Sequence, residues 1–210
     1  MGSDYRNFFS WETALWLAIG GVTALAVHGA DDAIRSALED PEATLTKSLD
    51  LNGGAQYGNL AAQVPLAIGW WTIGQATGSS RGAAVGRDLL RAQISAMSWT
   101  YAIKYAVDRT RPNGDPRSFP SGHASAAFAT AMVLQEHFGW KAGVPAFAMA
   151  AYTAASRVGV NQHWASDVVF GTAVGLASGR TVTIAVRETR LSLGPLAVPG
   201  GGGVLVTALR

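Results

Sequence analysis

Two long stretches that contain no aspartate, glutamate, lysine or arginine raise the question of membrane spans, and they constrain the fold more than any other feature. They cover residues 13–30 and 51–80. A helix without charges can be the core helix of a bundle or can cross a bilayer. Threonines, glycines and His28 interrupt the first stretch, and asparagines and glutamines interrupt the second. We therefore interpret both as buried core helices. Membrane spans are the alternative, because helices rich in small residues can pack together in lipid.

Small and apolar residues dominate the composition, which also favours closely packed helices. Alanine (37) and glycine (25) together make up about 30% of the 210 residues. Hydrophobic residues make up 49% and charged residues 14%, against roughly 25% charged residues in a typical soluble domain. A chain of this length can bury a sizeable core as one domain. The composition excludes a disordered tail and a charged coiled coil.

The charge balance and the lack of cysteine exclude several classes of function. Sixteen basic and fourteen acidic residues give a net charge of +2. This surplus is too small for a protein that binds nucleic acid through bulk charge, so we expect no nucleic-acid partner. Without cysteine there is no disulfide, thiolate metal site or cysteine nucleophile. Asp115 and Asp167 are too isolated for a two-metal site, and we expect no metal and no cofactor.

Breaks in the apolar pattern predict a chain of helices joined by short loops. After Arg180 a β-branched, alternating pattern predicts short strands in a hairpin or small meander. We therefore predict an all-α fold in a single domain, residues 1–210. It comprises a bundle of about six or seven helices over residues 8–180 and a small β appendage over 181–210. The predicted helices cover 8–28, a short region from Asp31 that includes Pro41, 56–75, 83–107, 122–137, 141–157 and 162–179.

A first polar cluster pairs Lys104 with Arg111. Seven helical steps of about 100° make nearly two turns, so the two positions share a face. Pro112 disfavours helix at Arg111, which places that arginine at or just past a helix end. Two cations that converge beside a loop suit a phosphate group, which accepts several donors at once. By itself the pattern is more often that of a solvated helix end.

A second cluster is the segment Pro120-Ser121-Gly122-His123. Proline and serine before an alanine-rich stretch predict a helix start with Ser121 as its cap. The first amides of that helix are free to bind an anion, and Gly122 lets a ligand approach the backbone closely. His123 would then lie beside the anion, where it can give or take a proton. A capped helix with a structural histidine is the alternative.

A third cluster contains Arg157, His163 and Asp167. The histidine and the aspartate are four residues apart, so on one helix the carboxylate can reach the imidazole. Such a contact fixes the ring orientation and stabilises the imidazolium. Gly159 and Asn161 can end one helix and start the next, which lets Arg157 fold back over the histidine. A structural ion pair is the alternative here.

Five other residues are interpreted as structural. Gly171, Gly175 and Gly179 are spaced by four residues and predict a seam of close helix packing. His28 lies near the end of an apolar helix, and we interpret it as incidental. His137 lies at a predicted helix C-terminus, where a cation is favourable.

Together the three clusters resemble the signature motifs of the phosphatidic acid phosphatase type 2 superfamily. This superfamily includes bacterial lipid phosphatases, class A acid phosphatases and vanadium haloperoxidases. The resemblance implies a helical bundle that hydrolyses phosphate esters without a metal, through a phosphohistidine. It implies that His163 is the nucleophile, that Asp167 holds its tautomer, and that His123 protonates the leaving group and then activates water. The residues implied to bind the phosphoryl oxygens are Lys104, Arg111, Ser121, Gly122 and Arg157.

The substrate is less constrained by the motifs. The apolar composition, with Trp164 and Phe119 beside the motifs as residues that could line a substrate opening, favours lipid phosphates or lipid diphosphates. A non-specific acid phosphatase acting on small soluble esters is the alternative. A vanadium-dependent haloperoxidase is disfavoured because such enzymes are typically much longer. A module that only binds lipid headgroups is disfavoured because both histidines and the aspartate are present.

The resemblance also predicts an exported protein. Residues 1–3, Met-Gly-Ser, are typical of a start from which a natural leader is missing. We expect a soluble or peripheral bundle that is periplasmic, or that is associated with the membrane and faces the periplasm. Contact with a membrane surface is part of this expectation.

Overall fold

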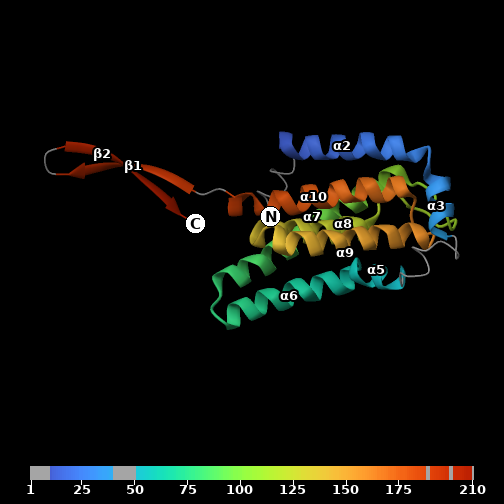
Figure 1. Cartoon of the computed structure of the whole chain (residues 1–210), viewed down its shortest axis with the longest axis horizontal. Coiled ribbons are helices and arrows are strands. Elements are labelled where there is room, and N and C mark those ends of the chain that lie inside the picture. The colour runs from blue at the N-terminus through green and yellow to red at the C-terminus, as the bar shows by residue number, and fades with distance from the viewer. Residues whose placement is uncertain (1–9, 40–50, 188–189, 199–200, 210) are drawn as a thin grey trace.

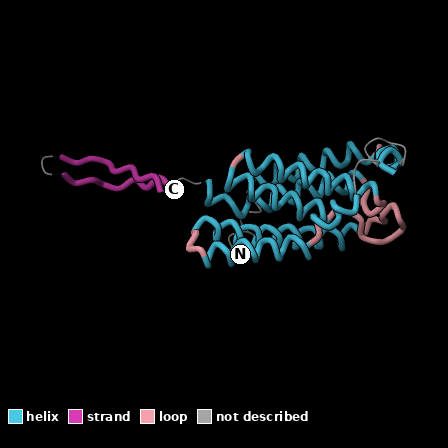
Figure 2. Tube along the Cα trace, turned by 60° about the horizontal axis from the view of Figure 1, so that its bottom comes forward, coloured by secondary structure: helices cyan, strands magenta, loops and turns pink. Residues whose placement is uncertain are grey.

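The structure is a computed structural model that describes residues 10–39, 51–187, 190–198 and 201–209. Long helices lie side by side in a bundle (Figures 1 and 2). The predicted all-α class is confirmed. The helices are α2 (Trp11–His28), α3 (Asp31–Glu39), α5 (Leu51–Tyr57), α6 (Leu60–Ala76), α7 (Ser80–Val107), α8 (Gly122–Phe138), α9 (Trp140–Gly159) and α10 (Ala165–Arg187).

Helix α8 is the centre of the bundle and packs against α7, α9 and α10. The remaining long helices lie outside this group, with α2 on α10 and α6 on α7. Helix α3 turns away from α2 by 77° and lies at one end of the bundle (Figure 1). The helix predicted to include Pro41 extends into residues outside the described ranges. The loops that follow α7 and α9 lie at the same end as α3 (Figure 1).

The predicted glycine seam is confirmed as the contact between α10 and α8. A Cβ atom added at Gly171, Gly175 or Gly179 would lie 2.6, 2.4 or 2.7 Å from a backbone carbonyl oxygen of α8. A side chain at any of these positions would therefore separate the two helices. The seam brings the first turn of α10 beside the start of α8.

The interpretation of both uncharged stretches as buried core helices is wrong. Trp11, Val22 and Leu25 of α2 are 81%, 69% and 76% exposed, and Ile73 of α6 is 65% exposed. By composition alone, a helix that is apolar on every side fits the core of a bundle or its outer surface equally well. Here both helices lie on the outer surface. No single helix among the described residues is long and apolar enough to span a membrane. Only α2 and α3 together meet that test, as a bent pair.

The prediction of a strand at residues 181–186 is wrong, because α10 continues to Arg187. The hydroxyls of Thr181 and Thr183 donate to carbonyls one turn back, at 2.7 and 2.9 Å. Val182 is buried in the cluster that includes Val85 and Leu89. Burial on one face of a helix here outweighs the preference of β-branched residues for strands. The helical body therefore ends about two turns later than predicted.

Two strands follow the bundle, β1 (Arg190–Val198) and β2 (Gly201–Leu209). They pair antiparallel, with Arg190 opposite Leu209 and Val198 opposite Gly201. A two-stranded hairpin on its own is marginally stable at best in water. We therefore assign the fold to the helices alone, and the β appendage stays a prediction.

Candidate active site

The three polar clusters meet at the end of the bundle where α3 lies. Backbone contacts tie them together, since Ser121 N donates to Asp167 O at 3.0 Å. A cavity of about 450 Å³ opens between them. Six of the eight predicted site residues line this cavity: Lys104, Arg111, Gly122, His123, Arg157 and His163. The other two, Ser121 and Asp167, are fully buried behind it.

The three predicted cations are held in different ways. Lys104 is buried, and its Nζ donates to the carbonyls of Arg117 and Ser118 at 2.6 and 3.0 Å. Arg111 donates from Nη1 to Gln162 Oε1 at 2.8 Å. Arg157 is buried, and its Nε has no hydrogen-bond acceptor among the described residues. A buried donor without an acceptor is unfavourable, and an anion in the cavity could satisfy it.

The cations also affect one another. Burial lowers the pKa of Lys104 to about 8, and the positive charges of Arg111 and Arg117 add to this effect, against the opposing charge of Asp167. Burial and the charge of Arg111 lower the pKa of Arg157 as well. The cavity therefore has a surplus of positive charge, which a dianionic phosphate would balance.

The start of α8 contributes backbone donors to the cavity. Ser121 is the predicted cap, and its Oγ accepts from Ala124 N at a long 3.4 Å. Gly122 and His123 are the first two helical residues, and both line the cavity. The first amides of a helix have no partner within the helix. Ser121 thus lies behind these amides as the helix cap.

Both site histidines are driven towards the neutral form. Burial lowers the pKa of His123 to about 4, and the charges of Arg157 and His163 add to the effect. Burial also lowers the pKa of His163 to about 4, although Asp167 opposes the shift. A neutral imidazole has a free lone pair and can act as a nucleophile or a base.

The sequence predicted that His163 and Asp167 lie on one helix, but only Asp167 lies on α10. His163 lies in the turn before α10, and Asp167 lies in the first turn of that helix. Their closest atoms, His163 Nδ1 and Asp167 Oδ2, are 3.5 Å apart, which is an ion-pair distance longer than a hydrogen bond. Asp167 Oδ2 also accepts from Trp164 N at 2.9 Å, as an acid three residues into a helix commonly does.

Asp167 has further partners that sequence reasoning missed. Ser118 Oγ donates to Oδ2, and Arg109 Nη1 donates to Oδ1 at 2.8 Å. Burial alone would raise the pKa of Asp167. The neighbouring His163 ring, the Ser118 hydroxyl, the Trp164 amide and the charge of Arg109 outweigh burial and hold that pKa below its usual value. Arg109 lies between Lys104 and Arg111 in the sequence. Its position between two predicted site residues is a signal by which sequence reasoning could have found it.

Two other expectations need correction. His28 is not incidental, because its Nδ1 lies 3.1 Å from Asp31 Oδ2 and 3.1 Å from Arg109 Nη2. Trp164 and Phe119 do not line the 450 Å³ cavity, and the aromatic residues that do so are tyrosines. Trp164 Nε1 instead donates to Thr110 O, and Phe119 stacks on the ring of Phe170. The tyrosines are Tyr101 and Tyr105.

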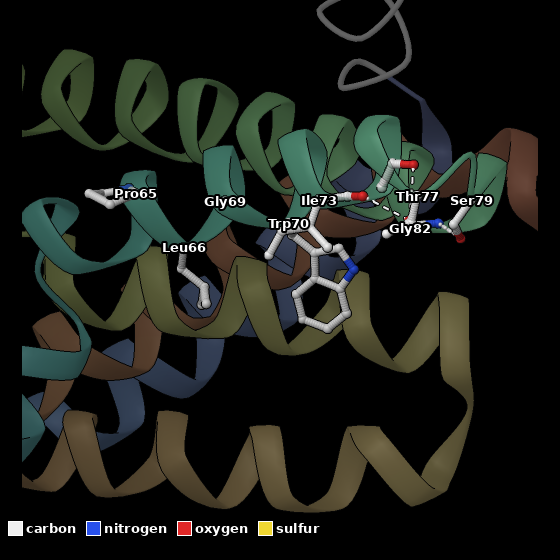
Figure 3. A pocket seen from close by; sticks show the side chains of 9 residues that line it. Pro65, Leu66, Gly69, Trp70, Ile73, Thr77, Ser79 and Gly82 are labelled. Carbon is white, nitrogen blue, oxygen red and sulfur yellow. Dashed lines mark hydrogen bonds between the residues drawn. The ribbon is translucent and has the colours of Figure 1, made fainter.

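The described residues offer no metal site, and the cavity between α6 and α7 differs in chemistry from the candidate site. No three histidine, cysteine, aspartate or glutamate side chains gather there as a metal site would require. A larger cavity of about 540 Å³ lies between α6 and α7 (Figure 3). No charged residue lines it, and Leu66, Trp70 and Ile73 form much of its wall. This apolar cavity lacks groups for acid–base or phosphate chemistry.

Comparison with known families agrees with this geometry. Residues 113–190 match the model of the PAP2 superfamily, which confirms the resemblance inferred from the three motifs. The matched segment contains both site histidines and Asp167. Over this segment the chain is similar to the PAP2 superfamily, and Lys104 and Arg111 lie before it.

Two curated relatives match over part of their length. One is the lipid A 1-phosphatase of Porphyromonas gingivalis, 42% identical over 82 residues, or 37% of this chain and 18% of that protein. The other is the lipid A 4'-phosphatase of Helicobacter pylori, 34% identical over 79 residues, or 38% of this chain and 40% of that protein. The matches thus span less than half of either relative.

Two solved structures share the fold over most of the chain. A transmembrane PAP2-type phosphatidylglycerolphosphate phosphatase from Bacillus subtilis aligns with a TM-score of 0.68 at 22% identity, covering 90% of this chain and 99% of that one. LpxE from Aquifex aeolicus aligns with a TM-score of 0.60 at 20% identity, covering 73% and 93%. At these identities the likeness shows the fold alone.

Proposed function

We propose that this chain is a phosphatase that hydrolyses the phosphate esters or diphosphates of lipids. The observation that carries the proposal is the composition of the 450 Å³ cavity. Four cations, two histidines held neutral and the start of a helix share it, and Arg157 Nε has no acceptor among the described residues. Phosphoryl transfer needs little more than positioned positive charge, a nucleophile and a proton donor.

In the proposed mechanism, Lys104, Arg111, Arg157 and the amides at the start of α8 bind the phosphoryl oxygens. Because Nδ1 of His163 faces Asp167, the other ring nitrogen, Nε2, attacks phosphorus. The bond from Nε2 to phosphorus forms as the bond to the ester oxygen breaks. Asp167 stabilises the positive charge that develops on the ring.

His123 handles the protons in both halves of the reaction. The bound dianion raises the proton affinity of His123, so the ring can donate a proton to the departing alkoxide. The neutral ring then removes a proton from water, and that water attacks the phosphohistidine. Inorganic phosphate leaves and His163 is restored. Ser121 supports these steps as the cap that orders the helix start, and a contact from its hydroxyl to phosphate is part of the proposal.

Three observations favour a lipid substrate over a soluble ester. Tyr101 and Tyr105 at the cavity are 51% and 66% exposed, so apolar surface surrounds the opening. The curated relatives are named for lipid A, a phosphorylated lipid. The outer helices α2 and α6 also expose many large apolar side chains, which suits contact with lipid. A non-specific acid phosphatase is the second candidate function.

The large apolar side chains that α2 and α6 expose also support membrane association. As the family resemblance implies, the site would face the periplasm, at the bilayer interface and outside this apolar belt. This placement replaces the expectation of a soluble bundle.

Phosphate release from a panel of substrates tests the function. We expect phosphatidate, phosphatidylglycerol phosphate, polyprenyl diphosphate or lipid A in detergent to be hydrolysed faster than p-nitrophenyl phosphate or glycerol phosphate. Equal rates on lipids and soluble esters would favour the acid phosphatase, and bromide oxidation with vanadate and peroxide would favour a haloperoxidase. No phosphate release from any ester would refute the proposal.

Metal independence is a separate prediction of the proposed mechanism. The cations of the cavity are protein side chains, so activity should survive EDTA unchanged. Vanadate should compete with the substrate because it resembles the five-coordinate transition state. Loss of activity in EDTA that magnesium or zinc restores would show that a metal takes part.

A further inference from the structure

A network of buried ion pairs lies outside the 450 Å³ cavity and touches the catalytic pair. Its centre is Arg109, which donates from Nη1 to Asp167 Oδ1 and from Nη2 to Asp31 Oδ2, each at 2.8 Å. Neither Arg109 nor Asp31 lines the cavity. Asp31 also lies outside the segment that matches the PAP2 superfamily. Nothing in the proposed mechanism yet uses either residue.

The position of Asp31 is fixed by the packing of the N-terminal helices. Gly20 of α2 faces Ala173 of α10, where an added Cβ would lie 2.2 Å from the alanine Cβ. With α2 held this closely, the 77° bend turns α3 across the end of the bundle. Asp31, the first residue of α3, is 4% exposed and accepts from Ser166 N and Ser166 Oγ at 2.9 and 2.6 Å.

The two oxygens of Asp167 have separate partners. Oδ1 accepts from Arg109, whereas Oδ2 faces His163 and accepts from Ser118 and Trp164. Because Arg109 is shared with Asp31, its positive charge does not act on Asp167 alone. The two carboxylates and the guanidinium together carry a net charge of −1, part of which acts on the imidazole of His163.

We infer that Asp31, acting through Arg109, is a positioning residue for the nucleophile His163. Asp31 holds Arg109 on the outer oxygen of Asp167, which leaves the inner oxygen and part of the carboxylate charge for His163. This inference rests on the proposed phosphatase function. It adds that an N-terminal helix outside the matched segment tunes the reaction.

The inference makes opposite predictions for two neutralising substitutions. Asp31→Asn removes a negative charge near His163, so the pKa of His163 should fall. Arg109→Gln removes a positive charge, so the pKa of His163 should rise. The other groups that face His163 stay constant in both variants, and they come from α7, the loop after it, α8, α9 and α10: Lys104, Arg111, His123, Arg157 and Asp167.

The kinetic test compares both variants with a matched control. Asp32 is the next residue of α3, with a side chain that is 85% exposed and 3.9 Å from Arg35. Asp31→Asn and Arg109→Gln should each lower kcat about tenfold to a hundredfold, by analogy with the outer-shell partners of metal ligands, with KM little changed. The acidic limb of the kcat/KM profile should move to lower pH in the first variant and to higher pH in the second. Asp32→Asn should match the wild type in both respects.

A titration of the histidines separates this inference from the proposed function. The chain has four histidines, so ¹⁵N-histidine NMR can follow each ring, with His163→Ala assigning the signal. If the wild type released no phosphate, the proposed function would be wrong, but the titration would still measure the coupling. Shifts of the histidine pKa with one sign in both variants, or with no change in either, would overturn the inference.

If Asp31→Asn does not fold, Arg109→Lys provides a second test. It should lower kcat while leaving the acidic limb in place, because lysine keeps the positive charge but loses the paired guanidinium donors. Wild-type kcat in that variant would also overturn the inference.

Discussion

Two buried histidine–aspartate pairs lie at opposite ends of α7 and α8. In the active site, His163 Nδ1 is 3.5 Å from Asp167 Oδ2. At the far end, His137 Nε2 is 3.0 Å from Asp88 Oδ2. The two histidine side chains are 3% and 4% exposed, so burial and pairing do not distinguish them. Only the first pair is proposed to perform chemistry.

The surroundings of the two pairs explain the difference. Asp88 also binds Arg91 at 2.8 Å, and Arg81 donates to the carbonyl of His137, so the polar groups of the far end are used within the protein. Neither His137 nor Asp88 lines the 450 Å³ or the 540 Å³ cavity. His163 instead opens onto a cavity with a surplus of positive charge. The proposed function therefore requires open space and unmatched cations beside the histidine–aspartate pair, and only the first pair has both.

The largest expected effect is the contrast between alanine substitutions of the two paired histidines. His163→Ala should lower turnover of every substrate by roughly 10⁴-fold or more, because it removes the only proposed covalent acceptor. His137→Ala should leave kcat per folded molecule unchanged. Phosphate release, corrected for the folded fraction by circular dichroism, measures both. Activity in His163→Ala would contradict the proposal that the His163–Asp167 pair is reactive and the His137–Asp88 pair is not.

The next effect separates the two histidines of the site itself. General acid catalysis is worth about 10²- to 10⁴-fold for a poor leaving group and little for a good one. His123→Ala should therefore lose turnover of an alkyl phosphate by that factor. It should still form a phosphoenzyme from p-nitrophenyl phosphate, which accumulates because water activation is also impaired.

Rapid-quench kinetics test this prediction. His123→Ala should give a burst of up to one equivalent of nitrophenol, followed by a slow steady state, and His163→Ala should give no burst. The opposite pattern would reverse the roles assigned to the two residues.

The pH dependence of kcat/KM should reflect the burial of the site. The pKa of about 4 for His163 predicts that activity falls as pH drops below 4, because the nucleophile becomes protonated. The pKa of about 8 for Lys104 predicts a fall above pH 8, about tenfold per pH unit, because a cation is lost. Lys104→Arg keeps its charge at high pH and serves as the control. The ratio of wild-type to variant activity should decline above pH 8, and a constant ratio would show that Lys104 does not set this limb.

The smallest effect on activity is expected at the far pair. Asp88→Asn removes the carboxylate charge that pairs with the buried His137, so it should lower the free energy of unfolding by about 3 kcal/mol. The kcat of the folded variant should match the wild type. Thermal or denaturant unfolding with assays well below the transition measures both quantities. A loss of kcat without a loss of stability would mean that the two ends are coupled.

The residues of the candidate site were easier to predict from the sequence than the residues that hold them in place. Ser121 as a cap, Pro112 after Arg111 and the four-residue spacing of His163 and Asp167 are local signals, and local geometry follows from neighbouring residues. Asp31 had no such signal, because its partner Arg109 is 78 residues away in the sequence. A contact over that distance depends on the path of α2 along α10, which only the folded chain defines.

The sequence by itself determined the helical class, a seam of close packing at Gly171, Gly175 and Gly179, and which residues are proposed to bind and cleave a phosphate ester. These features follow from residue size, spacing and charge, which act over one or two helical turns. The tertiary structure decided that the apolar α2 and α6 lie on the outer side of the bundle and that residues 181–186 extend α10. It also decided that Asp31 reaches the catalytic pair through Arg109. The physical reason is that an apolar or β-branched stretch fits several environments equally well, and packing against distant parts of the chain selects one of them.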